Sequence, residues 1–273
     1  MGLVRSLGAA ALALAMAWAA GLAGPAAAEG PLRELATSDE GKGWLAVGRV
    51  NLGSAGYCTG ALIASDRVLT AAHCLYDSRT GRRVPVAEIE FVAGWRNGRA
   101  EAYRRVRRVA AHPDYVYDGI ETRDRVAFDL AVLELDRPIR NSTIRPFATT
   151  SRARWGDEVG IVSYATGRDD APSLEEVCRV LARDRRVLML SCDVDFGASG
   201  APIFMVEDGE ARIVSVVSAK AEVNQRRVAL AAEIDGTLEA VIAALGTGDG
   251  VFGPGTGVAP LRTGQNGAKF VRP

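Results

Sequence analysis

The chain has 273 residues, with 33 basic and 33 acidic side chains, and therefore carries no formal net charge. Hydrophobic residues make up 48% of it and charged residues 24%, which is typical of a globular protein and excludes a disordered chain. The balanced charge gives no reason to expect nucleic acid as a partner. The length fits one large domain or two small ones.

Residues 1–28 have the organisation of a signal peptide. Arg5 precedes an apolar stretch over residues 7–22, and Ala26 and Ala28 form a small-x-small pattern that predicts cleavage after Ala28. A transmembrane anchor is the alternative, but the stretch is rich in alanine and short for a spanning helix of about 20 residues. We therefore expect bacterial export and a secreted protein, periplasmic or extracellular, with no membrane association once the signal is removed.

Two further segments are expected to lie outside the folded domain. Residues 29–42 are polar, and we expect them to be mobile and to be a possible short propeptide, cut after Arg33. Residues 247–273 are rich in glycine and are expected to form a flexible tail.

Between these segments, short strand-like stretches alternate with turns. They cover residues 43–52, 61–73, 88–106, 126–135, 183–192, 201–206 and 211–219. Asn97-Gly98 divides the stretch 88–106 into two strand-like halves, and Asp208-Gly209 separates the stretches 201–206 and 211–219. Both dipeptides predict β-hairpins. Residues 138–150 are expected to connect two halves, and residues 237–245 have apolar side chains at helical spacing. Many short strands of this kind favour an all-β sandwich or barrel.

The four cysteines of an exported protein indicate two disulfides, because their number is even. Four cysteines allow three connectivities, of which we favour the local one, Cys58–Cys74 and Cys178–Cys192. A zinc site is the alternative. It is disfavoured because no CxxC motif occurs and the chain has only two histidines, so we expect no metal and no cofactor.

Ser199 lies in a run of small residues, Gly197 to Ala201, between two strand-like stretches. Such a run is either a tight turn that needs glycine or the setting of a serine that must be reached from outside. A nucleophilic serine needs a base to accept its proton and an acid to orient that base. His73 lies at a strand end and is the candidate base, whereas His112 is expected in a loop and has no catalytic feature.

Asp129 is the candidate acid, because it begins an apolar strand, where an unpaired carboxylate would be costly. The other acidic residues of this region lie in polar loops: Asp114, Asp118, Glu121 and Asp124. With His73, Asp129 and Ser199 in this order, the segments "LTAAHC", "FDLAVLEL" and "GASGAP" resemble the three signature segments of the chymotrypsin-like (trypsin-like) serine peptidases. An α/β-hydrolase is disfavoured, because its order is Ser, Asp, His.

The resemblance covers about residues 43–246 and implies two antiparallel six-stranded β-barrels. The first would span about 43–140 and the second about 152–235, followed by a short C-terminal helix at about 236–246. By the same resemblance Ser199 would attack the scissile carbonyl and His73 would transfer the proton. Asp129 would orient His73, and the backbone N–H groups of Gly197 and Ser199 would form the oxyanion hole.

Ala198 departs from the digestive members of this family, which have an aspartate there that pairs with a newly cut N-terminal ammonium. The chain also has no Ile-Val-Gly-Gly sequence before residue 43. It is therefore more similar to the bacterial branch that includes the glutamyl endopeptidases, which Cys178 and Cys192 also fit.

Four residues are expected to contact substrate. Asp193 stands six residues before Ser199, where trypsin-like enzymes keep an acid. Val217 corresponds to a histidine of glutamyl-specific members. The segment from Ser218 to Lys220 corresponds to the family's segment that pairs with the substrate backbone. Lys220 replaces a usual glycine, so it is expected to narrow the pocket or to pair with Asp193.

The sequence thus predicts a monomeric, secreted serine endopeptidase that acts on polypeptides through an acyl-enzyme. The alternative is a catalytically silent binding protein of the same fold. The preferred residue before the cleaved bond, the natural substrate and the activation step are left open by the sequence.

Overall fold

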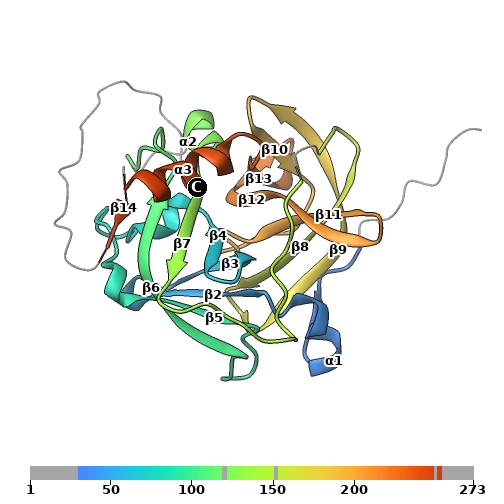
Figure 1. Ribbon diagram of the computed structural model, residues 1–273. Helices are drawn as coiled ribbons and strands as arrows, with labels where there is room; N and C mark the ends of the chain where they lie inside the picture. Colours follow the sequence, from blue (N-terminus) through green and yellow to red (C-terminus); the bar gives the residue numbers. More distant parts are fainter. Residues whose placement is uncertain (1–29, 119–121, 151–152, 249–250, 254–273) are drawn as a thin grey trace, which may run out of the picture.

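Figure 1 shows the computed structural model, which describes residues 30–118, 122–150, 153–248 and 251–253. The predicted signal peptide and most of the glycine-rich tail lie outside the described residues. Within the described part of the chain, no helix has both the length and the apolar character needed to cross a membrane.

Six antiparallel strands form a first closed barrel. They are β2 (Val47–Leu52), β3 (Tyr57–Ala64), β4 (Arg67–Thr70), β5 (Ile89–Ala93), β6 (Ala102–Ala111) and β7 (Ala131–Leu135). The pairing runs β6-β5-β2-β3-β4-β7, and β6 pairs with β7 to close the ring. In β6, Val106 and Val109 point inward while Arg105 and Arg107 are exposed. The arginine-rich part of this strand, residues 104–108, is therefore a solvated strand face around an apolar interior.

Six more antiparallel strands form a second closed barrel. They are β8 (Glu158–Ala165), β9 (Arg168–Asp184), β10 (Val187–Leu190), β11 (Pro202–Glu207), β12 (Glu210–Val223) and β13 (Arg226–Glu233). The order is β9-β10-β13-β12-β11-β8, closed by pairing of β9 with β8. Fully buried Ile161, Leu188 and Ile203 fill its interior. The predicted all-β fold with two six-stranded barrels is confirmed.

Both glycine-containing hairpin turns are confirmed. Asn97-Gly98 and Asp208-Gly209 adopt the left-handed φ values that a two-residue turn requires. Two other hairpins, at Arg185-Arg186 and at Asn224-Gln225, were not predicted, because these turns contain no glycine. All four residues nevertheless have positive φ. In these turns the flanking strand pairs impose the conformation, at a cost of about 1–2 kcal/mol per residue.

The remaining elements are short, apart from the expected C-terminal helix. They are β1 (Arg33–Glu34), α1 (Ser38–Gly41), η1 (Lys42–Trp44), η2 (Gly53–Ala55), η3 (Ala72–Leu75), η4 (Val86–Glu88), α2 (Arg123–Ala127), α3 (Thr237–Thr247) and β14 (Val251–Phe252). Helix α3 follows the second barrel but packs on β6 and β7 of the first, where Leu238, Val241 and Leu245 enter the core. It thereby ties the two barrels together (Figure 1).

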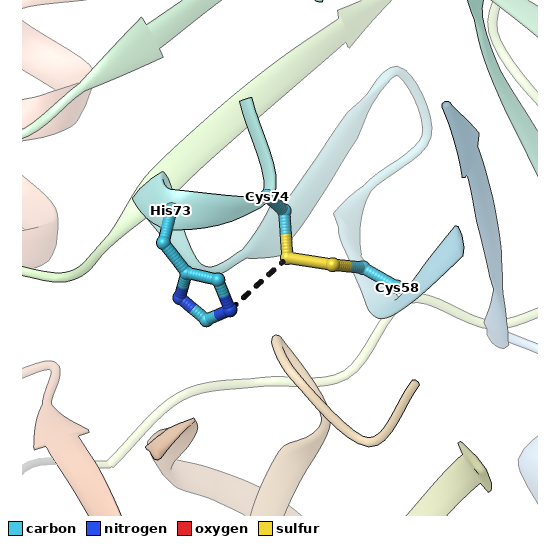
Figure 2. Close-up of side chains that lie close together, drawn as sticks. All are labelled: Cys58, His73 and Cys74. Atoms are coloured by element: carbon cyan, nitrogen blue, oxygen red, sulfur yellow. Dashed lines mark hydrogen bonds between the residues drawn. A yellow bond between two sulfur atoms is a disulfide. The ribbon is translucent and has the colours of Figure 1, made fainter. Parts of the chain in front are cut away.

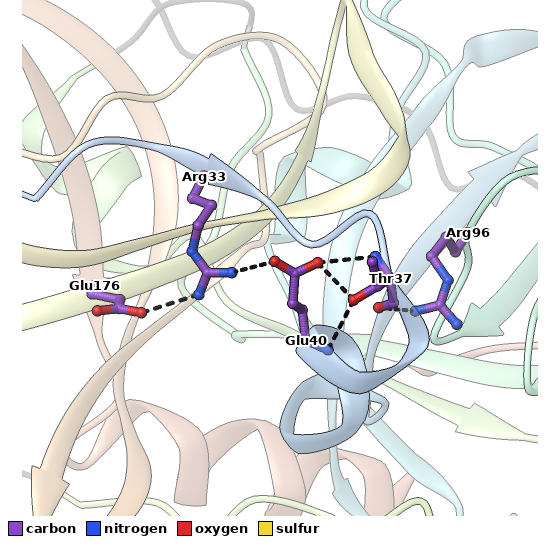
Figure 3. A network of polar contacts seen from close by, with 5 residues as sticks. All are labelled: Arg33, Thr37, Glu40, Arg96 and Glu176. Carbon is purple, nitrogen blue, oxygen red and sulfur yellow. Dashed lines mark hydrogen bonds and ion pairs between the residues drawn. The ribbon is translucent and has the colours of Figure 1, made fainter.

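The N-terminal segment was expected to be mobile, and its described part contradicts this. Strand β1 pairs with Ser173 and Leu174 of β9, and Leu35 is completely buried. Figure 3 shows the polar network that follows, in which Arg33 bridges Glu40 and Glu176 and Arg96 binds the carbonyl of Thr37. The strand pairing and the buried leucine outweigh the polar composition.

The start of the glycine-rich tail is likewise paired rather than flexible. Strand β14 pairs with Val109 and Ala110 of β6, and the Arg83 guanidinium lies over the Phe252 ring at 3.4 Å. The apolar pair Val251-Phe252 thus interrupts the glycine-rich composition that suggested a flexible chain.

Candidate active site

The pairing of β4 with β7 brings His73 and Asp129 together. Thr70 at the end of β4 lies opposite Ala131 at the start of β7. The residues just after Thr70 and just before Ala131 therefore meet at one end of the first barrel. His73 lies there in η3, and Asp129 lies in the connection from α2 to β7.

Asp129 is 1% exposed and binds His73 twice. Its Oδ1 accepts the backbone N–H of His73 at 2.8 Å, and its Oδ2 lies 2.6 Å from Nδ1 of the imidazole. Burial by itself raises the pKa of Asp129, but the charge of His73 and the hydrogen bonds from His73 and Ser218 outweigh it and hold the pKa below its usual value. An ionised Asp129 places a proton on Nδ1 and leaves Nε2 as the basic nitrogen.

Ser218 completes the environment of this carboxylate from the second barrel. Its hydroxyl donates to Asp129 Oδ2 at 2.5 Å. The register of β12 against β13 shifts between Val217 and Ala219, so Ser218 lies at an irregularity of the strand. The sequence had suggested only a contact with the substrate backbone, and the link to Asp129 was missed.

The other nitrogen of the imidazole lies near a disulfide. Nε2 of His73 is 3.9 Å from Cys74 Sγ, which is bonded to Cys58 of β3 (Figure 2). A second disulfide joins Cys178 of β9 to Cys192. These are the two pairs that the sequence favoured.

Neither disulfide leaves a usable metal site. Two groups of side chains among the described residues bring ligand atoms together: Cys58, His73 and Cys74, and Glu175, Cys178 and Cys192. In both groups the sulfur atoms belong to disulfides, so they carry no thiolate charge to bind a cation. His112 has a structural place instead, since its ring stacks on Phe128 and its Nδ1 accepts the N–H of Asp114.

Ser199 lies in the loop between β10 and β11, and its backbone is held by the first barrel. The N–H of Thr59 in β3 donates to the carbonyl of Ser199, and the Thr59 hydroxyl donates to the carbonyl of Gly197, each at 2.8 Å. The N–H of Gly200 donates to the carbonyl of Val217 at 2.8 Å. Thr59 had no distinguishing feature in the sequence, because it acts through a partner 138 residues away.

The small residues of this loop are required by close approach. Gly200 has φ +78°, and a Cβ there would lie 2.2 Å from the Thr70 hydroxyl and 2.4 Å from the Thr59 carbonyl oxygen. Any side chain would push the loop away from the segment that leads into His73. Gly200 thus allows the serine loop to pack directly on the first barrel.

The peptide between Phe196 and Gly197 has a fixed orientation. The Phe196 carbonyl accepts the N–H of Thr166 at 2.7 Å and its hydroxyl at 3.3 Å. In a trans peptide the N–H of Gly197 then points the opposite way. Neither this N–H nor that of Ser199 donates to an acceptor among the described residues, and no hydrogen bond joins the Ser199 hydroxyl to any of them. Two unused donors beside a serine are suited to bind an oxyanion.

The residues expected to contact substrate have defined surroundings in the structure. The N–H of Asp193 is held by Glu175 Oε2 at 2.8 Å, and Val217 is 2% exposed within the second core. Lys220 pairs with Asp195 at 2.8 Å, and its ammonium lies 4.1 Å above the ring of Phe196. The suggested pairing of Lys220 with Asp193 is therefore wrong.

Comparisons with known proteins agree with this geometry. A solved structure of a Glu endopeptidase in complex with MPD superposes with a TM-score of 0.64 at 18% identity, covering 80% of this chain and 97% of that one, which supports the fold. The glutamyl endopeptidase of Bacillus licheniformis is 26% identical over 152 residues, which are 55% of this chain and 46% of that protein, so the match spans under half of the relative. Residues 58–212 match the model of the trypsin-like peptidase domain, and the chain therefore belongs to that family.

Proposed function

We propose that this protein is a secreted serine endopeptidase that hydrolyses peptide bonds of polypeptides with Ser199, His73 and Asp129. The observation that carries the proposal is the pairing of His73 with the buried carboxylate of Asp129. A carboxylate with three donors, two of them from one histidine, is suited to fix the orientation and the tautomer of a catalytic base. The serine loop packs against Thr70 and Ala71, which lead directly into that histidine.

The proposed reaction follows from these positions. Ser199 Oγ attacks the carbonyl carbon of the scissile peptide while Nε2 of His73 takes the hydroxyl proton. The N–H groups of Gly197 and Ser199 bind the oxygen as it becomes negative, an effect of about 3–4 kcal/mol for one such donor. His73 then protonates the leaving amine, and a water molecule that it deprotonates releases the acyl group from Ser199.

The loop is proposed to be competent without a newly cut N-terminus. Ala198 is completely buried, and its N–H donates to the carbonyl of Asp195 within the turn. A buried methyl group offers no charge to an ammonium, so the loop is proposed to depend on the local turn geometry and on the Cys178–Cys192 disulfide instead.

The region near Asp193 is proposed to receive the residue that precedes the cleaved bond. Lys220 and Asp195 lie on two different segments of this region, and their ion pair is proposed to cross its entrance. Since an exposed pair contributes only about 0–1 kcal/mol, it can be opened by substrate. We expect Lys220→Gly to broaden the cleavage profile of a peptide library, and an unchanged profile would exclude this role.

The proposal is tested by labelling with a fluorophosphonate and by casein hydrolysis. The protein beginning at Glu29 should react, and mass spectrometry should locate the adduct on Ser199. Ser199→Ala should retain its melting temperature, take no label and lose about 10⁶-fold in kcat. A parent protein that takes no label would instead indicate the silent binding protein.

A further inference from the structure

Glu175 is a buried acid that the proposed reaction does not use. It lies in the middle of β9 and is 4% exposed, whereas the next residue, Glu176, points to solvent and binds Arg33. A carboxylate is rarely buried unless it is hydrogen-bonded or paired. Its Oε2 accepts the backbone N–H of Asp193 at 2.8 Å, at the point where the serine loop begins.

The strand that carries Glu175 is held on both edges. Ser173 and Leu174 pair with β8 on one side and with β1 on the other. Three residues after Glu175, Cys178 of the same strand is joined to Cys192, the residue before Asp193. Glu175 therefore extends from a rigid strand, and the segment that it binds is also tied covalently to the same strand.

The surroundings of Glu175 compensate its charge. Arg168, half-buried at the start of β9, lies close enough to Glu175, Asp193 and Asp195 for their charges to act on it. Burial lowers the pKa of Arg168. The negative charges of these carboxylates raise it, but burial has the larger effect. Arg168 therefore lies close to the acids around the first residues of the serine loop.

The bond to Asp193 affects the residues that follow it. Two residues later, the carbonyl of Asp195 accepts the N–H of Ala198, and the Phe196 carbonyl is held by Thr166. These bonds orient the Gly197 N–H only if the beginning of the loop stays in place. Charged acceptors form hydrogen bonds about twice as strong as neutral ones, so Glu175 is suited to hold it.

We propose that Glu175 is a positioning residue: its carboxylate fixes the Asp193 amide and so sets the loop that carries the oxyanion donors and Ser199. It takes over the loop-ordering task that Ala198, with no charge, cannot perform. This inference rests on the proposed function for its effect on catalysis, but not for its effect on the loop.

The test compares Glu175→Met, which removes the acceptor, and Glu175→Gln, which keeps a neutral one, with the exposed control Glu176→Gln. Hydrogen exchange of the amides at 193–199 and kcat/KM per titrated active site are measured well below each melting temperature. We expect Glu175→Met to exchange about tenfold faster and to lose about tenfold in kcat/KM, mostly in kcat. Glu175→Gln should be intermediate, and Glu176→Gln should stay within about twofold of the parent.

Exchange and kcat/KM of Glu175→Met within twofold of the parent, with only a lower melting temperature, would overturn the proposal. If Glu175→Met does not fold, Glu175→Gln decides: unchanged exchange at 193–199 means that Glu175 does not position the loop. A parent without peptidase activity would refute the proposed function, while the exchange data would still decide the role of Glu175.

Discussion

The two halves of the candidate site are built by different means. The first barrel contributes His73 and Asp129, which are joined by two hydrogen bonds to the Asp129 carboxylate, and Asp129 itself is buried. The second barrel contributes Ser199 on a loop whose neighbour Phe196 is 71% exposed. That loop is held through its backbone, by Thr59 from the other barrel and by Glu175 from β9.

The first half of the site depends on the chemistry of two side chains, whereas the second depends on where the backbone places the serine. A base and its acid need particular side chains, so substituting either one should affect the reaction far more than the fold. The nucleophile needs an accurately placed backbone, so groups distant in sequence should affect it gradually. The predictions below test this contrast.

On the side of the base and its acid, Asp129→Asn should have the largest effect of the four changes that follow. The amide would present an N–H or a neutral oxygen to His73 and would favour the wrong tautomer of the imidazole, so kcat should fall about 10⁴-fold. Because the side chain keeps its shape, the circular dichroism spectrum should be unchanged. Steady-state kinetics with a chromogenic peptide measure the loss. A decrease below tenfold would show that Asp129 does not orient the base.

Removal of residues 29–36 tests the docked N-terminal segment. A chain beginning at Thr37 loses β1 and the buried side chain of Leu35, whose burial contributes about 2–3 kcal/mol. Its melting temperature should fall by about 5–10 °C relative to a chain beginning at Glu29. Calorimetry of both proteins measures the difference. Equal melting temperatures would instead support a propeptide that leaves the fold intact.

Thr59→Val should have a smaller effect, on the serine side of the comparison. Valine has the shape of threonine but removes the hydroxyl that donates to the Gly197 carbonyl and accepts the Tyr164 N–H at 3.0 Å. Leaving these buried groups unpaired should cost about 1–3 kcal/mol and lower kcat/KM about tenfold. Thr59→Ser, which keeps the hydroxyl, is the matched control and should recover most of the activity.

His112 should show the smallest effect, in the pH dependence of stability alone. Burial lowers the pKa of His112, and the charge of Asp114 opposes this only in part. The unfolded chain therefore binds a proton that the folded protein rejects, so stability falls as the pH decreases through about 6.5. His112→Asn should flatten urea-unfolding free energies between about pH 7 and 5 without changing kcat. A parallel decrease in parent and variant would exclude His112 as the cause.

Features that depend on neighbouring residues could be predicted from the sequence. The two glycine hairpins, the C-terminal helix and the three short segments around His73, Asp129 and Ser199 each express a local requirement of backbone or chemistry. The strand-like stretches favoured an all-β sandwich or barrel, and the resemblance of the three segments to the serine peptidases implied the two β-barrels and the candidate residues.

Contacts between distant segments were decided by the tertiary structure. Ser218, which lies at a register shift in β12, binds Asp129 from 89 residues away in the chain, and Lys220 of the same strand pairs with Asp195 rather than Asp193. The segment 29–42 was expected to be mobile because it is polar as a whole, yet its described part docks on β9, which pairs with β1, and Leu35 is buried. Register, bulges and free sheet edges exist only once two strands have paired. No local sequence pattern could therefore indicate these contacts.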